Sequence, residues 1–443
     1  MTTNVRPPVR DLAAPKAPSI VSAEIEGGVR VVAVRRPSVP LVEVRIVLPM
    51  SSDQITSPAE PLVLSESLLA GTERLDRNEI ASAIERLGGS LGAYVDRDTF
   101  VVGASALASN LTELFALIDE VLAEATFPAS EVSADRTRTA DEVEIVLSRP
   151  GVIADEVFDE TMFPGHPYAT RIPRPAAIRR VSSPVLRDLY RTMLSSKGAQ
   201  IVVVGDVEAR KVARVAEDAL GEWIATSRRK STKLARVKGV EPAPLSLRDR
   251  PGAVQSNLRI GGAAPDRMSP DWPAMMLATL ATGGMFTSRL VANLRERNGY
   301  SYSPRLRVRH GRAGSVSTFS AEVATEATAA SLVETRYELG RVATSGLVQD
   351  ELDASRRYAI GSFLYSTATQ AGLASTLARL LADGVEPSYL GSYPAKLSRV
   401  SLAEANDAAR RYLAPSQLST IVVGDADKVV AQLEVIEERV ESV

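Results

Sequence analysis

An arginine and a tyrosine seven positions apart, Arg295 and Tyr302, are two side chains that could act together on a ligand. A guanidinium holds five N–H donors in a rigid plane and stays charged at any physiological pH. A phenol adds one O–H donor, and two such groups at one edge can bind a peptide carbonyl or stabilise a developing oxyanion. Composition alone favours a plainer interpretation, a solvated helix arginine and an ordinary strand tyrosine.

The segment from Gly283 to Pro304, GGMFTSRLVANLRERNGYSYSP, must position this pair. Thr287 or Ser288 can begin a helix, because a hydroxyl there accepts from the unpaired N–H groups of the first turn. Charged residues such as Arg289 are expected to keep much of the helix surface in water. Asn298-Gly299 predicts its end, since glycine tolerates the left-handed conformation of a C-cap. This corner can bring the late arginine and the following tyrosine to one edge.

The chain has few residues that could carry out histidine or cysteine chemistry. There are two histidines, His166 and His310, and no cysteine. A zinc site of the His-x-x-Glu-His kind needs two histidines four residues apart on one helix, so none can be drawn anywhere in the sequence. We expect His166, between a glycine and a proline, to be a structural loop imidazole bonded to the backbone. His310 lies in a basic stretch and is expected to be exposed.

The composition is that of an ordinary globular protein. The chain has 443 residues, more than one core usually holds, with 45% hydrophobic and 24% charged residues. A net charge of −2 gives no basic footprint for nucleic acid. Residues 1–18 are proline-rich and predict a disordered tail, not a signal peptide. With no cysteine and no apolar run of membrane-spanning length, the expectation is a cytoplasmic protein without a membrane partner.

Two distant segments of the chain resemble each other. Ser183–Asp206 and Leu402–Asp425 both predict a helix, a turn and a buried strand ending in Val-Gly-Asp, and an amphipathic helix follows each. A single repeat of this kind indicates two homologous halves. The basic run, glycine and prolines of residues 225–244 are typical of an exposed linker. The predicted domains are therefore residues 19–224 and 245–443.

The predicted elements of both halves alternate between strands and helices. A hairpin over Ile20–Glu26 and Val29–Arg35 precedes a strand at Val42–Leu48 and a helix at Glu60–Ala70. The second half repeats this order more loosely and adds helices as far as Gln370–Asp383. The alternation predicts an α+β fold in which each half is a mainly antiparallel sheet with helices packed on one face.

The segment that carries the pair resembles the C-terminal signature of the pitrilysin/insulysin/mitochondrial processing peptidase family. That signature reads Gly-Gly, Ser-Arg-Leu, Leu-Arg-Glu and Gly-Leu-Ser/Ala-Tyr. The matching residues are Gly283-Gly284, Ser288-Arg289-Leu290, Leu294-Arg295-Glu296 and Gly299-Tyr300-Ser301-Tyr302, with Tyr300 in place of the usual leucine. The resemblance covers nearly all of the chain from about Ile20 onward. It implies two homologous domains, and it places the family's substrate-binding arginine and tyrosine at Arg295 and Tyr302.

The same resemblance implies where a zinc motif should lie. In the family, His-x-x-Glu-His lies on a helix just before Gly-Thr, and its glutamate is the general base. With Gly71-Thr72 as that landmark, the motif positions hold Leu62-Val63-Leu64-Ser65-Glu66, so both ligands and the base are absent. The family's third ligand corresponds to Glu142, or alternatively Glu144. One carboxylate is a weak transition-metal site, so we expect a surface carboxylate there and no metal or cofactor in this chain.

A chain with the pair but without the zinc ligands resembles the non-zinc subunit of the family's two-chain members. There a homologous partner carries His-x-x-Glu-His and zinc, and the two chains enclose a cavity that admits unfolded peptides. The resemblance therefore implies a heterodimeric metallopeptidase. In it, Arg295 would hold a substrate carbonyl and Tyr302 would donate to the oxyanion, in trans to the partner's zinc. Leader-peptide removal and peptide turnover both remain open.

Three alternatives to this function remain. The chain can be a catalytically inactive homodimeric peptide-binding protein, or a structural core subunit of a membrane respiratory assembly. It can also be an independent peptidase with an unfamiliar metal site. Retention of Arg295 together with Tyr302 argues against the purely structural role, and the histidine count argues against the independent peptidase.

Overall fold

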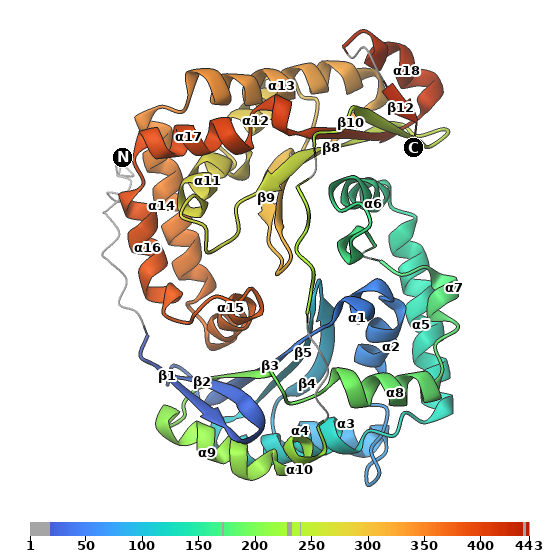
Figure 1. Cartoon of the computed structure of the whole chain (residues 1–443), viewed down its shortest axis with the longest axis vertical. Helices are drawn as coiled ribbons and strands as arrows, with labels where there is room; N and C mark the ends of the chain where they lie inside the picture. Colours follow the sequence, from blue (N-terminus) through green and yellow to red (C-terminus); the bar gives the residue numbers. More distant parts are fainter. Residues whose placement is uncertain (1–17, 171, 228–232, 240, 437–439, 443) are drawn as a thin grey trace, which may run out of the picture.

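The computed structural model describes residues 18–170, 172–227, 233–239, 241–436 and 440–442 (Figure 1). The predicted tail, apart from residue 18, and part of the predicted linker lie outside these residues. The described chain forms two six-stranded sheets, one in each half. The predicted domain boundary within 225–244 stays a prediction, and its described residues run without regular structure from α10 to β7.

The first sheet has the strand order β1-β2-β6-β3-β5-β4. Strand β6 pairs in parallel with β2, and every other neighbouring pair in this sheet is antiparallel. The strands are β1 (Ile20–Ile25), β2 (Val29–Arg35), β3 (Leu41–Pro49), β4 (Ser90–Asp96), β5 (Thr99–Leu107) and β6 (Gln200–Gly205). The predicted hairpin is thus β1–β2.

The second sheet has the order β12-β7-β11-β8-β10-β9, so β7, β11, β8, β10 and β9 repeat the arrangement of β2, β6, β3, β5 and β4. The repeat extends to direction, because β11 is parallel to β7 and antiparallel to β8. The strands are β7 (Leu245–Asp249), β8 (Gln255–Ala264), β9 (Arg305–Arg309), β10 (Ser315–Ala324), β11 (Ser419–Gly424) and β12 (Val440–Ser442). The predicted α+β fold with two mainly antiparallel sheets is confirmed.

Helices surround both sheets (Figure 1). In the first half they are α1 (Ser52–Thr56), α2 (Ala59–Ser67), α3 (Arg77–Arg86), α4 (Leu111–Glu124), α5 (Ala129–Leu147), α6 (Pro150–Met162), α7 (Pro175–Ile178), α8 (Ser183–Met193), α9 (Ala209–Ala219) and α10 (Gly221–Thr226). In the second half they are α11 (Trp272–Thr279), α12 (Arg289–Val291), α13 (Thr328–Ser345), α14 (Gln349–Ser366), α15 (Gln370–Ala382), α16 (Tyr389–Arg399), α17 (Leu402–Tyr412) and α18 (Ala426–Glu434). Two π-helical turns, η4 (Leu280–Gly284) and η5 (Ala292–Arg297), flank α12. None of the described helices is both long and apolar enough to cross a membrane.

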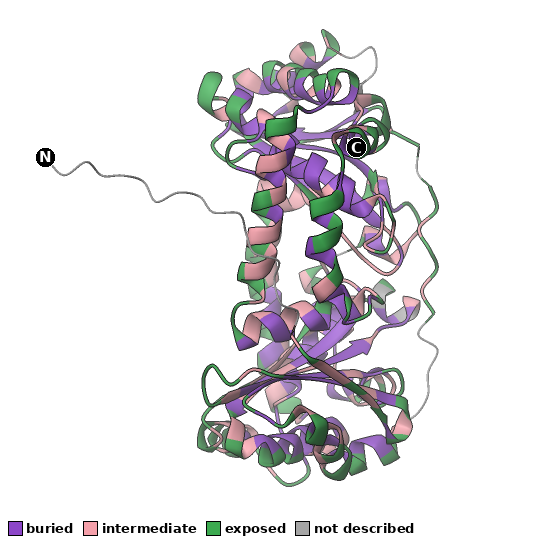
Figure 2. Ribbon diagram, turned by 90° about the vertical axis from the view of Figure 1, so that its left-hand side faces the viewer, coloured by how far each residue is buried: buried purple, intermediate pink, exposed green. Residues whose placement is uncertain are grey.

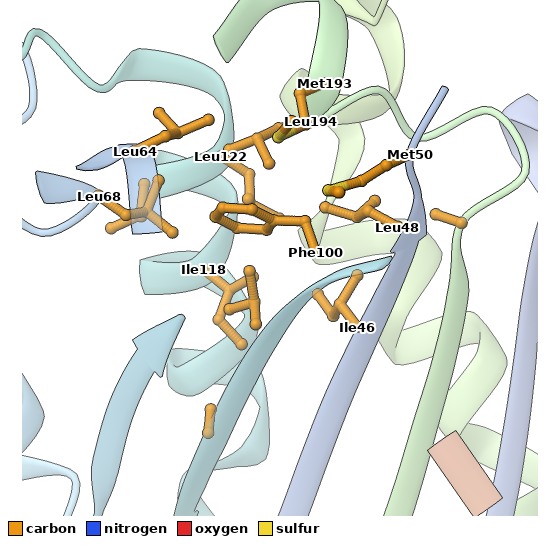
Figure 3. Packing of buried hydrophobic residues seen from close by; sticks show 14 of the residues in the cluster. Ile46, Leu48, Met50, Leu64, Leu68, Phe100, Ile118, Leu122, Met193 and Leu194 are labelled. Atoms are coloured by element: carbon orange, nitrogen blue, oxygen red, sulfur yellow. The ribbon is translucent and has the colours of Figure 1, made fainter. Parts of the chain in front are cut away.

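Alternate residues of the central strands enter two different cores. In β3, Ile46 and Leu48 pack in the first core, whereas Val47 packs in the second. Figure 3 shows Phe100 of β5 in the first core, surrounded by residues such as Leu48 of β3 and Leu122 of α4. Because both faces of these strands are covered, their sequences are nearly continuous apolar runs.

One helix from each half packs on the sheet of the other half. Helix α15 packs on β3 and β6 of the first sheet, and α6 packs on β8 and β11 of the second. These are equivalent strands of the two sheets, so the exchange is reciprocal. Figure 2 shows buried residues running from one half into the other along this seam. The sequence predicted α15 as a helix but did not predict that it covers the opposite half, and it did not predict α6 as a helix.

Candidate functional site

A pair of glycines fixes the turn that precedes α12. A Cβ on Gly283 would lie 2.7 Å from the Cβ of Leu306 and 2.9 Å from the Cδ1 of Leu290, too close for any other residue. The backbone of η4 therefore lies directly against β9 and the first turn of α12. This close approach sets the position from which the functional segment starts.

The predicted helix of the segment is a single α-helical turn that continues as the π-helical turn η5. Ser288 occupies the N-cap position, but its side chain makes no capping hydrogen bond. The amide of Asn298 donates to the carbonyl of Asn293 at 3.1 Å, which closes the wider turn. Gly299 has a φ of +65°, the left-handed conformation that the sequence predicts for the end of the helix. Single π-helical turns often occur at functional sites.

The corner brings Arg295 and Tyr302 together. The guanidinium carbon of Arg295 lies 4.8 Å from the ring centroid of Tyr302, and it lies at the same distance from the ring of Phe286. Tyr302 is 81% exposed, and the side chain of Arg295 is 31% exposed. Phe286 was not identified from the sequence, where its place in a turn between Met285 and Thr287 carries no pattern.

The two side chains keep donors available for a ligand. Arg295 forms one ion pair, from its Nε to a carboxylate oxygen of Glu296 at 3.2 Å. Within the described part of the chain, the hydroxyl of Tyr302 has no hydrogen-bond partner. The two Nη groups of Arg295 and the phenol O–H of Tyr302 thus remain available at one corner, and such donors can bind a carbonyl oxygen or an oxyanion.

Arg289 departs from its prediction as a solvated surface residue. Its guanidinium makes two hydrogen bonds of 2.7 Å to the carboxylate of Glu351 on α14 and a third, of 2.9 Å, to the carbonyl of Gly346. Burial disfavours the ionised form of Glu351, but the hydrogen bond from Arg289 and nearby positive charge outweigh it, so the pKa of Glu351 lies below its usual range. The prediction was wrong because α14, distant in sequence, covers this side of α12.

Asn293 holds η5 against the long helix α13. Its side-chain amide donates to the carboxylates of Glu334 at 2.8 Å and Glu338 at 2.9 Å. The amide of Asn298 in turn donates to the side-chain oxygen of Asn293 at 2.7 Å. These buried contacts, which the sequence pattern did not predict, fix the backbone from which Arg295 projects.

The positions of the expected zinc motif lie on α2 and do not fit a metal. Leu62 is apolar, and the hydroxyl of Ser65 donates to the carbonyl of Leu62 at 2.8 Å. Glu66 is paired at 2.9 Å with Arg138 of α5, which also pairs with Glu142 at 3.1 Å. A guanidinium thus lies between the two carboxylates. In the described residues, no three His, Cys, Asp or Glu side chains are arranged to hold a metal ion.

His166 is the structural loop imidazole that the sequence predicts. Its Nδ1 accepts from the amide of Tyr168 at 3.1 Å, and its Nε2 is 2.9 Å from the carbonyl of Ala235. The second contact ties the loop to the segment between the two halves. The alternative third-ligand position, Glu144, is exposed and paired with Arg179 at 3.3 Å.

His310 is largely buried, so the prediction that it is exposed was wrong. Its ring lies edge-on to Trp272 with the centroids 4.4 Å apart, and its Nδ1 is 2.9 Å from the hydroxyl of Ser315. Burial, together with the charge of Arg267, lowers the pKa of His310 to about 3. The basic residues around it in sequence suggested exposure, but α11 packs on β9 and its Trp272 covers one side of the ring, which also borders a cavity.

A cavity of about 450 Å³ lies at the seam between the halves. Leu62 of α2 and Arg309 of β9 face it from opposite halves, and Asp383 borders it from the end of α15. Arg309 pairs with Asp159 of α6, which is 1% exposed. Four arginines and two aspartates line the cavity, and within the lining Arg267 pairs with Asp383.

Two family models match the chain. The model described as Insulinase (Peptidase family M16) matches residues 64–176, and the model described as Peptidase M16 inactive domain matches residues 180–358. An uncharacterized zinc protease of Mycobacterium leprae is 23% identical over 298 residues, 66% of each chain. A second, of Streptomyces coelicolor, is 23% identical over 54% of this chain and 53% of its own. The matched stretches thus span less than two thirds of the length of these relatives.

Solved structures share the fold over almost their whole length. A peptidase M16 inactive domain from Pseudomonas fluorescens aligns with a TM-score of 0.83 and 21% identity, covering 92% of this chain and 98% of that one. A protease from Helicobacter pylori aligns with a TM-score of 0.82 and 18% identity, covering 92% and 99%. At this level of identity the likeness extends to the fold and not to the site.

Proposed function

The chain belongs to the M16 peptidase family, and we propose that it is the subunit without zinc ligands in a heterodimeric zinc metallopeptidase. The proposed partner is a homologous chain that carries His-x-x-Glu-His, and the proposed substrate is an unfolded peptide. Leader-peptide removal and general peptide turnover are the two uses we consider for this activity.

The exposed corner formed by Arg295 and Tyr302 is the observation that carries the proposal. The two groups lie together and keep donors free. Figure 1 places α12, at this corner, and α2, which holds the expected motif positions, in opposite halves of the molecule. The positions on α2 have no metal ligands of their own, so a zinc site facing the pair must come from another chain.

In the proposed complex this chain binds and orients the substrate. The free guanidinium N–H groups of Arg295 hold a peptide carbonyl close to the bond to be cleaved. The hydroxyl of Tyr302 donates to the carbonyl oxygen as negative charge develops on it. The contact of the Arg295 guanidinium with the Tyr302 ring keeps the two donors close together before the substrate arrives, and preorganised donors stabilise a transition state more than mobile ones do. The chemistry that a zinc ion bound by the partner would supply is the activation of a water molecule.

A tagged purification from the native host tests the assembly. We expect a homologous chain of similar length that carries His-x-x-Glu-His to co-purify at equal stoichiometry. Zinc content should follow that partner and not this chain. A chain that emerges as a homodimer would favour the catalytically inactive peptide-binding protein. Stoichiometric zinc and peptidase activity in this chain alone would contradict the proposal.

Substitutions in the pair test the proposed chemistry. In the reconstituted complex, assayed with an unstructured fluorogenic peptide, Arg295→Ala and Tyr302→Phe should each lower kcat by about 10²–10³, the usual cost of losing one transition-state donor. Both variants should retain the native melting temperature, because the side chains are exposed. The matched control is Tyr365→Phe, which alters a tyrosine that is 84% exposed in the same half. Full activity in both pair variants would exclude these roles.

A further inference from the structure

Phe286 is an exposed aromatic residue whose ring contacts the guanidinium of Arg295. The residue is 65% exposed, although phenylalanine is among the residue types most often buried. It lies in the turn between η4 and α12, held by the backbone hydrogen bond from Ser288 to Met285 at 3.1 Å. Its ring centroid is 4.8 Å from the guanidinium carbon of Arg295.

The guanidinium of Arg295 has three neighbours that restrict it. The rings of Phe286 and Tyr302 each lie 4.8 Å from its central carbon, and Glu296 pairs with its Nε at 3.2 Å. Aromatic rings contact the flat face of a guanidinium, so they leave the in-plane N–H groups unused. With Nε engaged by Glu296, the two Nη groups form the edge that remains available to a substrate.

An arginine side chain has many conformations in water, and fixing one of them during catalysis costs free energy. Two rings that hold the guanidinium beforehand reduce this cost. We propose that Phe286 is a positioning residue, which preorganises Arg295 so that its Nη edge faces the substrate carbonyl. This inference rests on the proposed function, and it adds Phe286 to the residues that the transition state depends on, although the phenylalanine itself supplies no donor.

The contact with Arg295 can be tested in the isolated chain. Aromatic rings shift the resonances of protons that lie over their faces, so the Nε–H signal of Arg295 in a chain with isotopically labelled arginine reports the two rings. Its assignment comes from Arg295→Lys. Phe286→Leu, which keeps an apolar side chain of similar size, should move this signal toward the position of solvent-exposed arginines. Phe286→Trp should retain the shifted position. An unchanged signal in Phe286→Leu would overturn the proposal.

The effect on the reaction is measured in the reconstituted complex with the same fluorogenic peptide. Phe286→Leu should lower kcat by about tenfold, the equivalent of one cation–π contact, with little change in KM. Phe286→Trp should restore the rate. In the Arg295→Ala background, Phe286→Leu should have no further effect, because the residue acts through the arginine. Tyr365→Leu removes a ring that is also exposed and that lies over no guanidinium in the described part of the chain, and it should leave kcat unchanged.

The two proposals fail in different ways. Full activity of Arg295→Ala would refute the proposed function, whatever Phe286 does. A slow Arg295→Ala with a fully active Phe286→Leu would refute the positioning role alone. Equal losses from Phe286→Leu in the native and Arg295→Ala backgrounds would indicate that Phe286 contacts the substrate or the partner directly, which also contradicts a role exerted through Arg295.

Discussion

Arg138 forms ion pairs with carboxylates on two helices, α2 and α5. It lies between Glu66 of α2 and Glu142 of α5, at two of the positions where the family's zinc ligands are expected. The guanidinium donates hydrogen bonds to both carboxylates, so each is engaged with a cation of this chain. Glu142, the residue at the family's third-ligand position, is thus engaged in an ion pair with Arg138.

A buried neutral imidazole makes the native state sensitive to acid. The pKa of His310 is about 3 in the folded chain, against 6.5 for the unperturbed group. Between pH 6.5 and pH 3 the unfolded state therefore binds a proton that the folded state does not, and the stability falls as the pH falls through this window. The contribution of this one group is up to about 1.4 kcal/mol per pH unit.

Replacing His310 should reduce that sensitivity. We expect the free energy of unfolding of His310→Gln, measured with urea at pH 7 and pH 5, to decline less over this interval than that of the native chain. Glutamine removes the titrating group but retains a polar side chain near Ser315. Equal declines in the two proteins would show that the imidazole is protonated in the folded state.

At the scale of elements, the functional corner depends on two long helices that lie far from it in sequence. Helix α14 supplies Glu351 to Arg289, and α13 supplies Glu338 to Asn293. These contacts anchor α12 and η5, the turns from which the partly exposed Arg295 projects. A rigid support of this kind is what positions a donor to within the tolerance that catalysis needs.

Glu351→Gln should destabilise the chain by about 1–3 kcal/mol, because it replaces a half-buried charged hydrogen-bond pair with a neutral one. The control is Asp350→Asn in the same first turn of α14, which matches the loss of charge near the helix N-terminus. Urea unfolding at pH 7 gives both values. Similar losses in the two variants would mean that the pairing with Arg289 contributes little.

The loss of stability caused by Glu351→Gln should depend on pH, because the pKa of Glu351 is lowered in the folded chain. A carboxyl with a folded-state pKa below its unfolded value, 4.5, contributes stability that is complete above that value and is lost as the pH falls through the folded pKa. The difference in the free energy of unfolding between the native chain and Glu351→Gln should therefore be largest at neutral pH and should become smaller below about pH 4.5.

At the scale of the whole molecule, the two halves are joined by the exchange of α6 and α15. Each helix leaves its own half and covers the second face of the opposite sheet. The pair between Asp159 of α6 and Arg309 of β9 lies inside this seam, with Arg97 3.9 Å from the same carboxylate. We therefore expect the halves to unfold together and not as independent domains.

Asp159→Asn tests the seam. Removing a buried carboxylate leaves the charge of Arg309 without its partner, and such a loss costs about 3–5 kcal/mol. Asp141→Asn breaks the exposed pair with Arg179 and should cost less than about 1 kcal/mol. The midpoint of urea unfolding, followed by circular dichroism, compares the two. Equal midpoints would show that the seam does not depend on this pair.

Several features followed from the sequence alone because they involve neighbouring residues or simple counting. Arg295 and Tyr302 belong to one short corner, so a helix, a glycine and a turn suffice to bring them together. The lack of a His-x-x-Glu-His motif needs no structure, since two distant histidines cannot form it. The order of most strands and helices followed from periodicity, although α6, α16 and β7 were not predicted, and the repeated Val-Gly-Asp strands indicated two similar halves.

Only the tertiary structure decided which surfaces meet. It placed α15 and α6 on the opposite sheets, buried His310 beneath Trp272, and set Phe286 against Arg295. Local patterns report which residues of an element avoid water, but they do not identify what covers them. That choice depends on the fit of whole surfaces contributed by distant parts of the chain, which no window of sequence contains.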